Sequence, residues 1–201
     1  MLKKINQQIK KGFTLVELVV TVSIVSVIMA VILFGYSSFN EDLRISSAEQ
    51  EISLAIRQAQ SYGLSVKEGS SGDFSKGYGI SFDTTDPTNY YIFVDKNNDG
   101  KNSATSACLA NSECVEKVTL RNAVRVSSVC GAVLVGDALN CVGVTSIHIT
   151  FIRPSPDAII RLYNGTTLVG TTYYRGQIKL TSAKGKIGTV TVDKTGQIYV
   201  Q

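Results

Sequence analysis

The stretch FTLVELVVTVSIVSVIMAVILFGY, residues 13–36, decides how this chain is organised. As an α-helix rising about 1.5 Å per residue it would be about 36 Å long, and a bilayer core is about 30 Å thick. Its serine and threonine hydroxyls can bond back to helix carbonyls, so they cost little in lipid. Glu17 is the one costly group, because a charged side chain inside a membrane is expensive and marks a functional residue by default. We therefore predict a transmembrane helix that carries a functional carboxylate.

The charge of the chain is concentrated ahead of this stretch. Four of its basic residues lie within residues 1–12, which contain no Asp or Glu: Lys3, Lys4, Lys10 and Lys11. The net charge is +4, and the rest of the chain has sixteen basic and sixteen acidic residues, so the composition does not indicate a nucleic-acid surface. Lysines before an apolar span mark its cytoplasmic flank, which places the remainder of the chain outside the cytoplasm. A secretory signal peptide is the alternative, but its apolar core is about 7–15 residues long and ends in a small-residue cleavage site.

The helical pattern continues through residues 37–62. Apolar residues recur there at spacings of mostly three and four, which is the mark of an amphipathic helix: Phe39, Leu43, Ala48, Ile52, Ala55, Ile56, Ala59 and Tyr62. No proline occurs between Met1 and Thr85, and Gly63 is a candidate helix stop. We predict one helix of about 50 residues. Its membrane half is 13–36, and its amphipathic half packs against the domain that follows.

Residues 63–201 have the features of a β-rich globular domain. Apolar and polar residues alternate in ten short segments rich in β-branched and aromatic residues. These segments are YGISF (78–82), YYIFV (90–94), VEKVTL (115–120), AVRVSSV (123–129), SIHITFI (146–152), AIIRLY (158–163), TLVGTTYY (167–174), QIKLT (177–181), IGTVTV (187–192) and QIYV (197–200). Asn164-Gly165 predicts a hairpin between two of them. A long helix followed by strands is an α+β fold with an antiparallel sheet, and the amphipathic helix would cover one face of that sheet.

The four cysteines all follow the apolar span. If that part of the chain lies outside the cytoplasm, disulfides would persist there. Four cysteines allow three connectivities. Pairing of sequence neighbours is favoured because each bond would close a short loop, contributing about 2–3 kcal/mol by chain entropy. The favoured pairs are Cys108 with Cys114 and Cys130 with Cys141.

The sequence VDKNNDGK places Asp95, Asn97 and Asp99 ahead of a glycine, in the pattern that opens an EF-hand calcium loop. The match then fails, because the twelfth position is Ser106 rather than Glu and no helix pair flanks the turn. Asn, Asp and Gly also favour a polar turn without any metal. Both hypotheses stay open, and calcium is the one cofactor that the sequence suggests. Two later carboxylates could complete such a site: Glu113 and Glu116.

The remaining polar residues do not form a catalytic set. His148 is the only histidine, and the alternation of its segment predicts that it faces solvent, opposite Ile147 and Ile149. No Ser-His-Asp or Cys-His arrangement can be built around it, so we do not expect an enzyme. The C-terminal third is basic, which is consistent with a DNA-contacting patch but is more typical of a solvated face. Its basic residues are Arg175, Lys179, Lys184, Lys186 and Lys194.

The run KKGFTLVEL, from Lys10 to Leu18, resembles the class III signal of bacterial type IV pilins and type II secretion pseudopilins. The resemblance covers about 25 residues: a basic leader, a glycine, a phenylalanine, a glutamate four residues later and an apolar helix. It implies that a membrane-embedded prepilin peptidase removes residues 1–12 by cutting after Gly12, and then methylates the new N-terminus at Phe13. That family also combines a long N-terminal helix with a small β domain.

The resemblance further implies a structural role. The chain would sit in the cytoplasmic membrane as a single-pass protein and then join other subunits in a pilus or pseudopilus fibre. Glu17 would pair there with the N-terminal amine of a neighbouring subunit's Phe13. Major pilins commonly carry a proline midway along the span, where this chain has Phe34 and Gly35, so we expect a minor, initiating or tip subunit. The alternatives are a binding module at a fibre tip, for DNA or for a surface, and an anchored enzyme.

Overall fold

The computed structural model describes residues 12–65, 76–103, 108–109 and 112–201 of the chain. The expected leader 1–11, most of the loop-like segment that follows the helix, and Ser106 lie outside the described residues. The chain forms two compact units that divide between Asn40 and Glu41. Each unit is considered by itself below.

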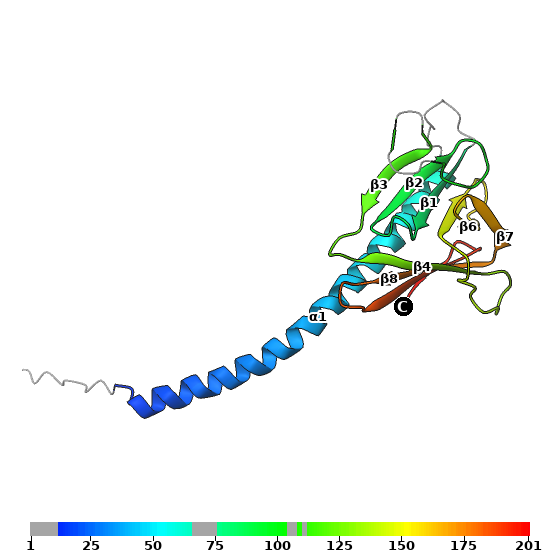
Figure 1. Cartoon of the computed structure of the whole chain (residues 1–201). Coiled ribbons are helices and arrows are strands. Elements are labelled where there is room, and N and C mark those ends of the chain that lie inside the picture. The colour runs from blue at the N-terminus through cyan, green and yellow to red at the C-terminus, as the bar shows by residue number, and fades with distance from the viewer. Residues whose placement is uncertain (1–11, 66–75, 104–107, 110–111) are drawn as a thin grey trace, which may run out of the picture. The chain divides into compact units, whose positions relative to one another are not determined.

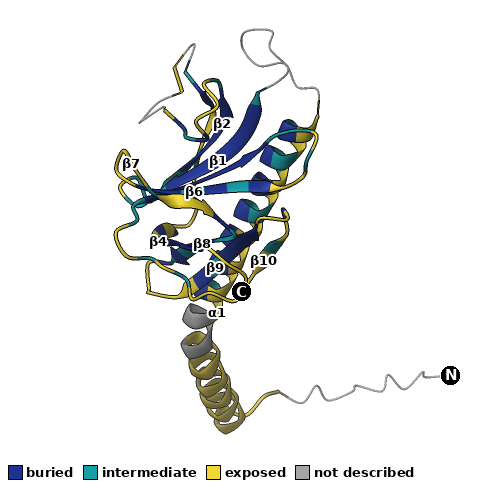
Figure 2. Cartoon of the chain, turned by 90° about the vertical axis from the view of Figure 1, so that its right-hand side faces the viewer, coloured by how far each residue is buried: buried dark blue, intermediate teal, exposed yellow. Residues whose placement is uncertain are grey.

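A single helix, α1 (Leu15–Leu64), runs for 50 residues, as the sequence predicts. Its segment Leu15–Leu33 is long and apolar enough to cross a membrane, with a mean hydropathy of 2.7. All of these residues are exposed to solvent (Figure 2). The hydroxyls within the segment donate hydrogen bonds to carbonyls one turn earlier, as expected: Thr21 to Leu18, Ser23 to Val19 and Ser26 to Val22. These three hydroxyls are therefore satisfied inside the helix, and apart from the exposed Glu17 carboxylate the surface of the segment is almost wholly apolar.

The second part of α1 packs against the β domain with one face. The buried apolar residues of this face recur every three or four positions: Ile45, Ala48, Ile52, Ala55, Ile56 and Ala59. The predicted stripe was wrong at its start, because Phe39 is 61% exposed and Leu43 is 48% exposed. The buried apolar face begins at Ile45 and also includes the carboxylate of Glu49, which accepts a hydrogen bond of 2.8 Å from the Thr189 backbone N–H. Glu49 can therefore be buried in the packed face, because the Thr189 backbone N–H donates a hydrogen bond to its carboxylate.

The β domain contains ten strands in two antiparallel sheets (Figure 1). The strands are β1 (Gly77–Asp83), β2 (Asn89–Asp95), β3 (Cys114–Thr119), β4 (Arg125–Ala132), β5 (Ser146–Phe151), β6 (Ala158–Asn164), β7 (Thr167–Tyr173), β8 (Arg175–Thr181), β9 (Ile187–Asp193) and β10 (Ile198–Val200). Six form a sheet in the order β3-β2-β1-β5-β6-β7, and four form a sheet in the order β10-β9-β8-β4. Each corresponds to a predicted segment, but the division into two sheets was not predicted. Gly165, with φ of 59°, lies in the hairpin between β6 and β7, as the sequence indicated.

Helix α1 and the two sheets enclose one hydrophobic core. The helix supplies Ile52 and Ile56, and each sheet contributes alternate residues of its strands. Near its C-terminal end the helix approaches β5 closely, since a Cβ on Gly63 would meet the backbone carbonyl of Phe151. Gly63 lies within the helix and allows this contact, rather than ending the helix as predicted. In β8 only every second residue is buried, so one face of the smaller sheet is solvated.

The larger sheet is different, because its central strands are buried on both faces. Every residue of β5 is buried, and so is nearly every residue of β1 and β2. One face packs on the core, and the chain that leaves β2 folds back over the other face. The prediction that His148 faces solvent is therefore wrong: its side chain is 5% exposed. The alternation of β5 was correct, but the outer face is covered by a loop.

Candidate functional site

The residues at the start of α1 form a short exposed segment. Gly12 and Phe13 precede the helix, and Phe13 is 77% exposed. Thr14 caps the helix: its side-chain oxygen accepts a hydrogen bond of 3.2 Å from the Glu17 backbone N–H, and its carbonyl accepts one from Leu18. The spacing Thr-x-x-Glu is that of a capping box, and a carboxylate in the first turn also interacts favourably with the helix dipole. Glu17 thus has a local role that the sequence interpretation missed, although Thr14-Leu15-Val16-Glu17 was visible as a signal.

The predicted turn residues lie together after β2. Asp95 is 1% exposed, and its Oδ2 accepts a hydrogen bond of 2.8 Å from the Gly100 backbone N–H. Asn97 and Asp99 are exposed, and the Asn97 Oδ1 accepts a 3.1 Å hydrogen bond from the Asp99 N–H. Burial raises the pKa of the Asp95 carboxyl, and the charges of Asp99 and Glu113 raise it further, against the opposing Gly100 N–H. The turn is therefore well ordered by its own backbone and crowded with negative charge.

The structure distinguishes the two carboxylates proposed to complete this turn. Glu113 is buried, and its two oxygens accept hydrogen bonds from the backbone N–H groups of Lys96 (3.1 Å) and Ser103 (2.9 Å). It therefore holds both ends of the turn. Glu116 lies on the side of the sheet that faces the helix, where it contributes to the charge around Tyr90. Only Glu113 belongs to the neighbourhood of Asp95.

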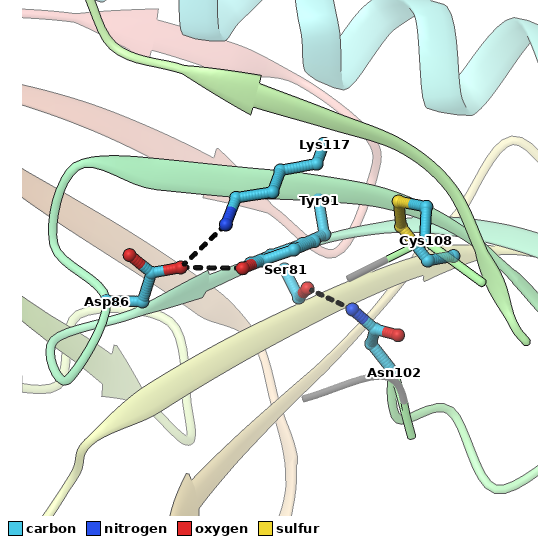
Figure 3. The surroundings of a disulfide bond; sticks show 7 residues. Ser81, Asp86, Tyr91, Asn102, Cys108 and Lys117 are labelled. Atoms are coloured by element: carbon cyan, nitrogen blue, oxygen red, sulfur yellow. Dashed lines mark hydrogen bonds and ion pairs between the residues drawn. A yellow bond between two sulfur atoms is a disulfide. The ribbon is translucent and has the colours of Figure 1, made fainter. Parts of the chain in front are cut away.

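The loop that begins with this turn covers the outer face of the larger sheet. The Asn102 backbone N–H donates to the His148 Nδ1 at 3.1 Å, and the Asn102 side chain donates to the Ser81 Oγ at 3.1 Å (Figure 3). The Lys101 ammonium lies 5.0 Å from the centre of the Tyr163 ring. Together these contacts attach the loop to three neighbouring strands, β1, β5 and β6.

His148 is held as a neutral structural group beneath this loop. Since its Nδ1 accepts the Asn102 N–H, the ring proton lies on Nε2, which is 3.4 Å from the Ser146 hydroxyl. Burial, with a smaller contribution from the nearby Lys101 charge, lowers the pKa of His148 to about 3. The aromatic rings of Phe93 and Tyr163 pack against its imidazole. A ring whose free nitrogen is already occupied is a poor candidate for a general base.

Two disulfides join the cysteines in neighbouring pairs, Cys108 with Cys114 and Cys130 with Cys141. The first lies at the end of the covering loop, next to the start of β3 (Figure 3). The second closes the connection that follows β4, whose apolar residues Val133, Leu134 and Val135 are exposed. Both bonds therefore restrain loops rather than join the two sheets.

The comparisons with known proteins bear on the exposed start of the helix. Residues 8–33 match the prokaryotic N-terminal methylation motif. No curated protein and no solved structure matches the chain. The motif supports a class III signal of the kind that type IV pilins and pseudopilins carry, as expected of a prepilin-type precursor. The motif implies processing by a prepilin peptidase and association with other pilin subunits. The motif belongs to structural subunits and not to an enzyme family.

The exposed apolar part of α1 fits this prepilin-type precursor. From Leu15 to Leu33 the segment offers an apolar surface on all sides. A helix of this kind is stable only inside a membrane or among other apolar helices. Single-pass anchoring would place this helix in a membrane, and packing in a fibre would then place it among other apolar helices.

The basic residues of the C-terminal third are partly neutralised in this precursor. Arg175 forms a bidentate pair with Asp193, with Nε 2.6 Å from its Oδ1. Lys186 lies 2.8 Å from the Asp42 carboxylate of α1. Arg175 and Lys186 therefore have acidic partners, which weakens the DNA-contacting interpretation and favours a solvated face.

Proposed function

We propose that this chain is a structural subunit of a type IV pilus or a type II secretion pseudopilus, cut between Gly12 and Phe13 and methylated at Phe13. The observation that carries the proposal is the methylation motif on an exposed apolar helix. The described residues leave open space around Gly12, which suits access by a peptidase. Lysines precede the span, so the β domain would lie outside the cytoplasm.

Glu17 would guide assembly through its charge. Packing apolar helices that have already left water yields little hydrophobic gain, so close packing and polar contacts must set their register. After the cut, the positive N-terminal amine of Phe13 would lie about one helical turn from Glu17. We propose that Glu17 of one subunit pairs with the Phe13 amine of its neighbour. The exposure of both residues in the single chain supports this pairing.

A minor, initiating or tip position suits the chain better than a major one. The span contains no proline, whereas major pilins commonly carry one midway along it. The two disulfides each close a separate short loop, and their paired cysteines are 6 and 11 residues apart in the sequence. A subunit used in few copies would be present in the fibre at a small fraction of the amount of the main subunit.

Two substitutions separate the proposed intermolecular role of Glu17 from its local capping role. Glu17→Gln removes the charge but keeps the length of the side chain. Thr14→Ala removes the cap, at about 1 kcal/mol of helix stability, but keeps the charge. Both would be expressed in cells that contain the matching assembly system. Incorporation would be measured by immunoblotting of sheared fibres, and processing by mass spectrometry of the N-terminus.

We expect both variants to be cut and methylated at Phe13, and only Glu17→Gln to be absent from fibres. Normal incorporation of Glu17→Gln would disprove the pairing. Equal loss with Thr14→Ala would show that only the cap matters. A further variant, Gly12→Val, should accumulate as the uncut precursor, and cleavage at any other bond would place the site elsewhere. The ratio of this chain to the main subunit in purified fibres tests the minor role, which parity would contradict.

A further inference from the structure

The buried carboxylate of Asp95 has one oxygen without a partner. Its Oδ2 accepts the Gly100 N–H, while Oδ1 is fully enclosed and accepts no hydrogen bond from the described residues. Leaving a buried carboxylate oxygen unsatisfied costs more than leaving a neutral polar group unsatisfied. An oxygen of this kind is therefore expected to have a ligand.

The turn around Asp95 presents oxygen atoms of the type that a hard cation prefers. Asn97 and Asp99 follow Asp95 at alternate positions, and the chain turns sharply at Gly100, where φ is 68°. Calcium loops use this arrangement, with side-chain oxygens at the first, third and fifth positions and a glycine at the sixth. The structure thus adds to the sequence pattern a buried oxygen without a hydrogen-bond partner at the first position.

Two basic side chains lie beside this turn, and each has a different contact. Lys101 lies over the Tyr163 ring, and the Arg161 guanidinium lies against Gly100. In the described part of the chain, neither basic group forms an ion pair with Asp95 or Asp99. The charge of Asp99 disfavours the charged form of Asp95, and a divalent cation between the two carboxylates would relieve that repulsion.

We propose that the turn formed by Asp95, Asn97 and Asp99 binds one calcium ion, with Asp95 Oδ1 as its buried ligand. Within the described residues, no three His, Cys, Asp or Glu side chains gather as a metal cluster. The remaining ligands are therefore amide oxygen, backbone carbonyl and water, which calcium accepts and zinc does not favour. Because this site has few charged ligands, we expect a dissociation constant for calcium of about 0.1–1 mM, as in extracellular calcium modules. The site is independent of the proposed role in fibres.

Calcium at this turn would also fix the loop that covers the larger sheet. The turn leads directly to Asn102, whose backbone N–H donates to His148, and to Ser103, whose N–H donates to Glu113. An ion that holds the start of the loop reduces its freedom to lift from the sheet. We therefore expect calcium to slow hydrogen exchange at these two backbone amides, compared with the chelated protein.

The test uses the full chain in detergent micelles, stripped of metal with a chelator. Binding would be measured by calorimetry with calcium and by terbium luminescence, which the nearby Tyr163 can sensitise. Asp95→Asn removes the buried charge but keeps the shape of the side chain, and Asp99→Asn removes an exposed one. The matched control is Asp42→Asn, which removes a carboxylate of α1 that pairs with Lys186.

We expect one calcium ion per chain, at least tenfold weaker binding in Asp95→Asn, weaker binding in Asp99→Asn and no change in Asp42→Asn. If Asp95→Asn does not fold, the exposed Asp99→Asn variant decides the result by itself. The proposal is overturned by a lack of heat and luminescence up to about 10 mM ion, a concentration well above the expected range. It is also overturned if both turn variants bind like the parent chain, or if magnesium binds equally well.

Discussion

Acid should destabilise the β domain through His148. The perturbation is a shift from pH 7.5 to pH 5, compared between the parent chain and His148→Gln, which cannot titrate but still offers an acceptor to Asn102. In the folded protein burial holds the pKa of His148 at about 3, whereas in the unfolded chain it is about 6.5. The unfolded state therefore binds the additional proton between these two values.

The magnitude follows from proton linkage. The pKa of His148 is lower in the folded state than in the unfolded state. The free energy of unfolding therefore decreases as the pH falls below the unfolded-state pKa. At pH 5, about 1.5 pH units below 6.5, the unfolded state gains about 2 kcal/mol from protonation, while His148 in the folded state is still neutral. We expect the free energy of unfolding of the parent chain to fall by about 2 kcal/mol more than that of His148→Gln.

The assay is urea unfolding of the full chain in micelles at both pH values, followed by tyrosine fluorescence. The chain has no Trp, and eight of its nine tyrosines lie beyond Glu41, so the signal reports on the β domain. The raised pKa values of Glu49 and Asp95 act in the opposite direction, but they are common to both proteins and cancel in the difference. A difference below about 0.5 kcal/mol would refute the reasoning. Because His148 is the only histidine, its imidazole NMR signal should also stay unshifted down to pH 5.

Other substitutions test the packing of the β domain. Ile52→Ala on α1, at a fully buried position, should lower the free energy of unfolding by about 2–5 kcal/mol in the same urea assay, and a loss under 1 kcal/mol would show that the helix face is not part of the core. Gly188→Ala should cost about 1–3 kcal/mol, because the added Cβ would meet the Glu49 carboxylate; unchanged stability would argue against this contact. Replacing Cys130 and Cys141 together with serine should cost about 3 kcal/mol by loop entropy, visible as a lower urea midpoint, and an unchanged midpoint would contradict that estimate.

The periodicity of the sequence predicted the helix and the strands well, but it did not predict which strands pair with one another. The ten strands and the 50-residue helix follow from spacings that a single segment contains. The two sheets do not, because β4 pairs with β8, more than forty residues later, while β5 pairs with β1. Such pairings depend on which faces are buried in the complete domain, and the alternation of one strand does not contain that information.

At the candidate sites, too, features within one segment were predicted better than contacts between distant segments. The methylation signal and the turn at Asp95 are local patterns of sequence, and in the structure a hydrogen bond from the Gly100 N–H to Asp95 closes that turn. The environment of His148 was predicted wrongly because a loop without periodicity covers it through Asn102. The capping of α1 by Thr14 is also local, because the spacing from Thr14 to Glu17 that indicates it lies within one helical turn. Contacts made by irregular segments are therefore where sequence reasoning was least informative.

The position of the helix cap has a consequence for processing. Thr14 lies on the C-terminal side of the proposed cut, so the first hydrogen bonds of α1 come from residues that the mature chain keeps. Removing the leader would therefore change the charge at this end, by discarding four lysines and creating one amine, without rebuilding any turn of the helix. Cleavage would therefore change the charge at the N-terminus of a helix that is already formed. The subunit could then pair with its neighbour without any further folding of that helix.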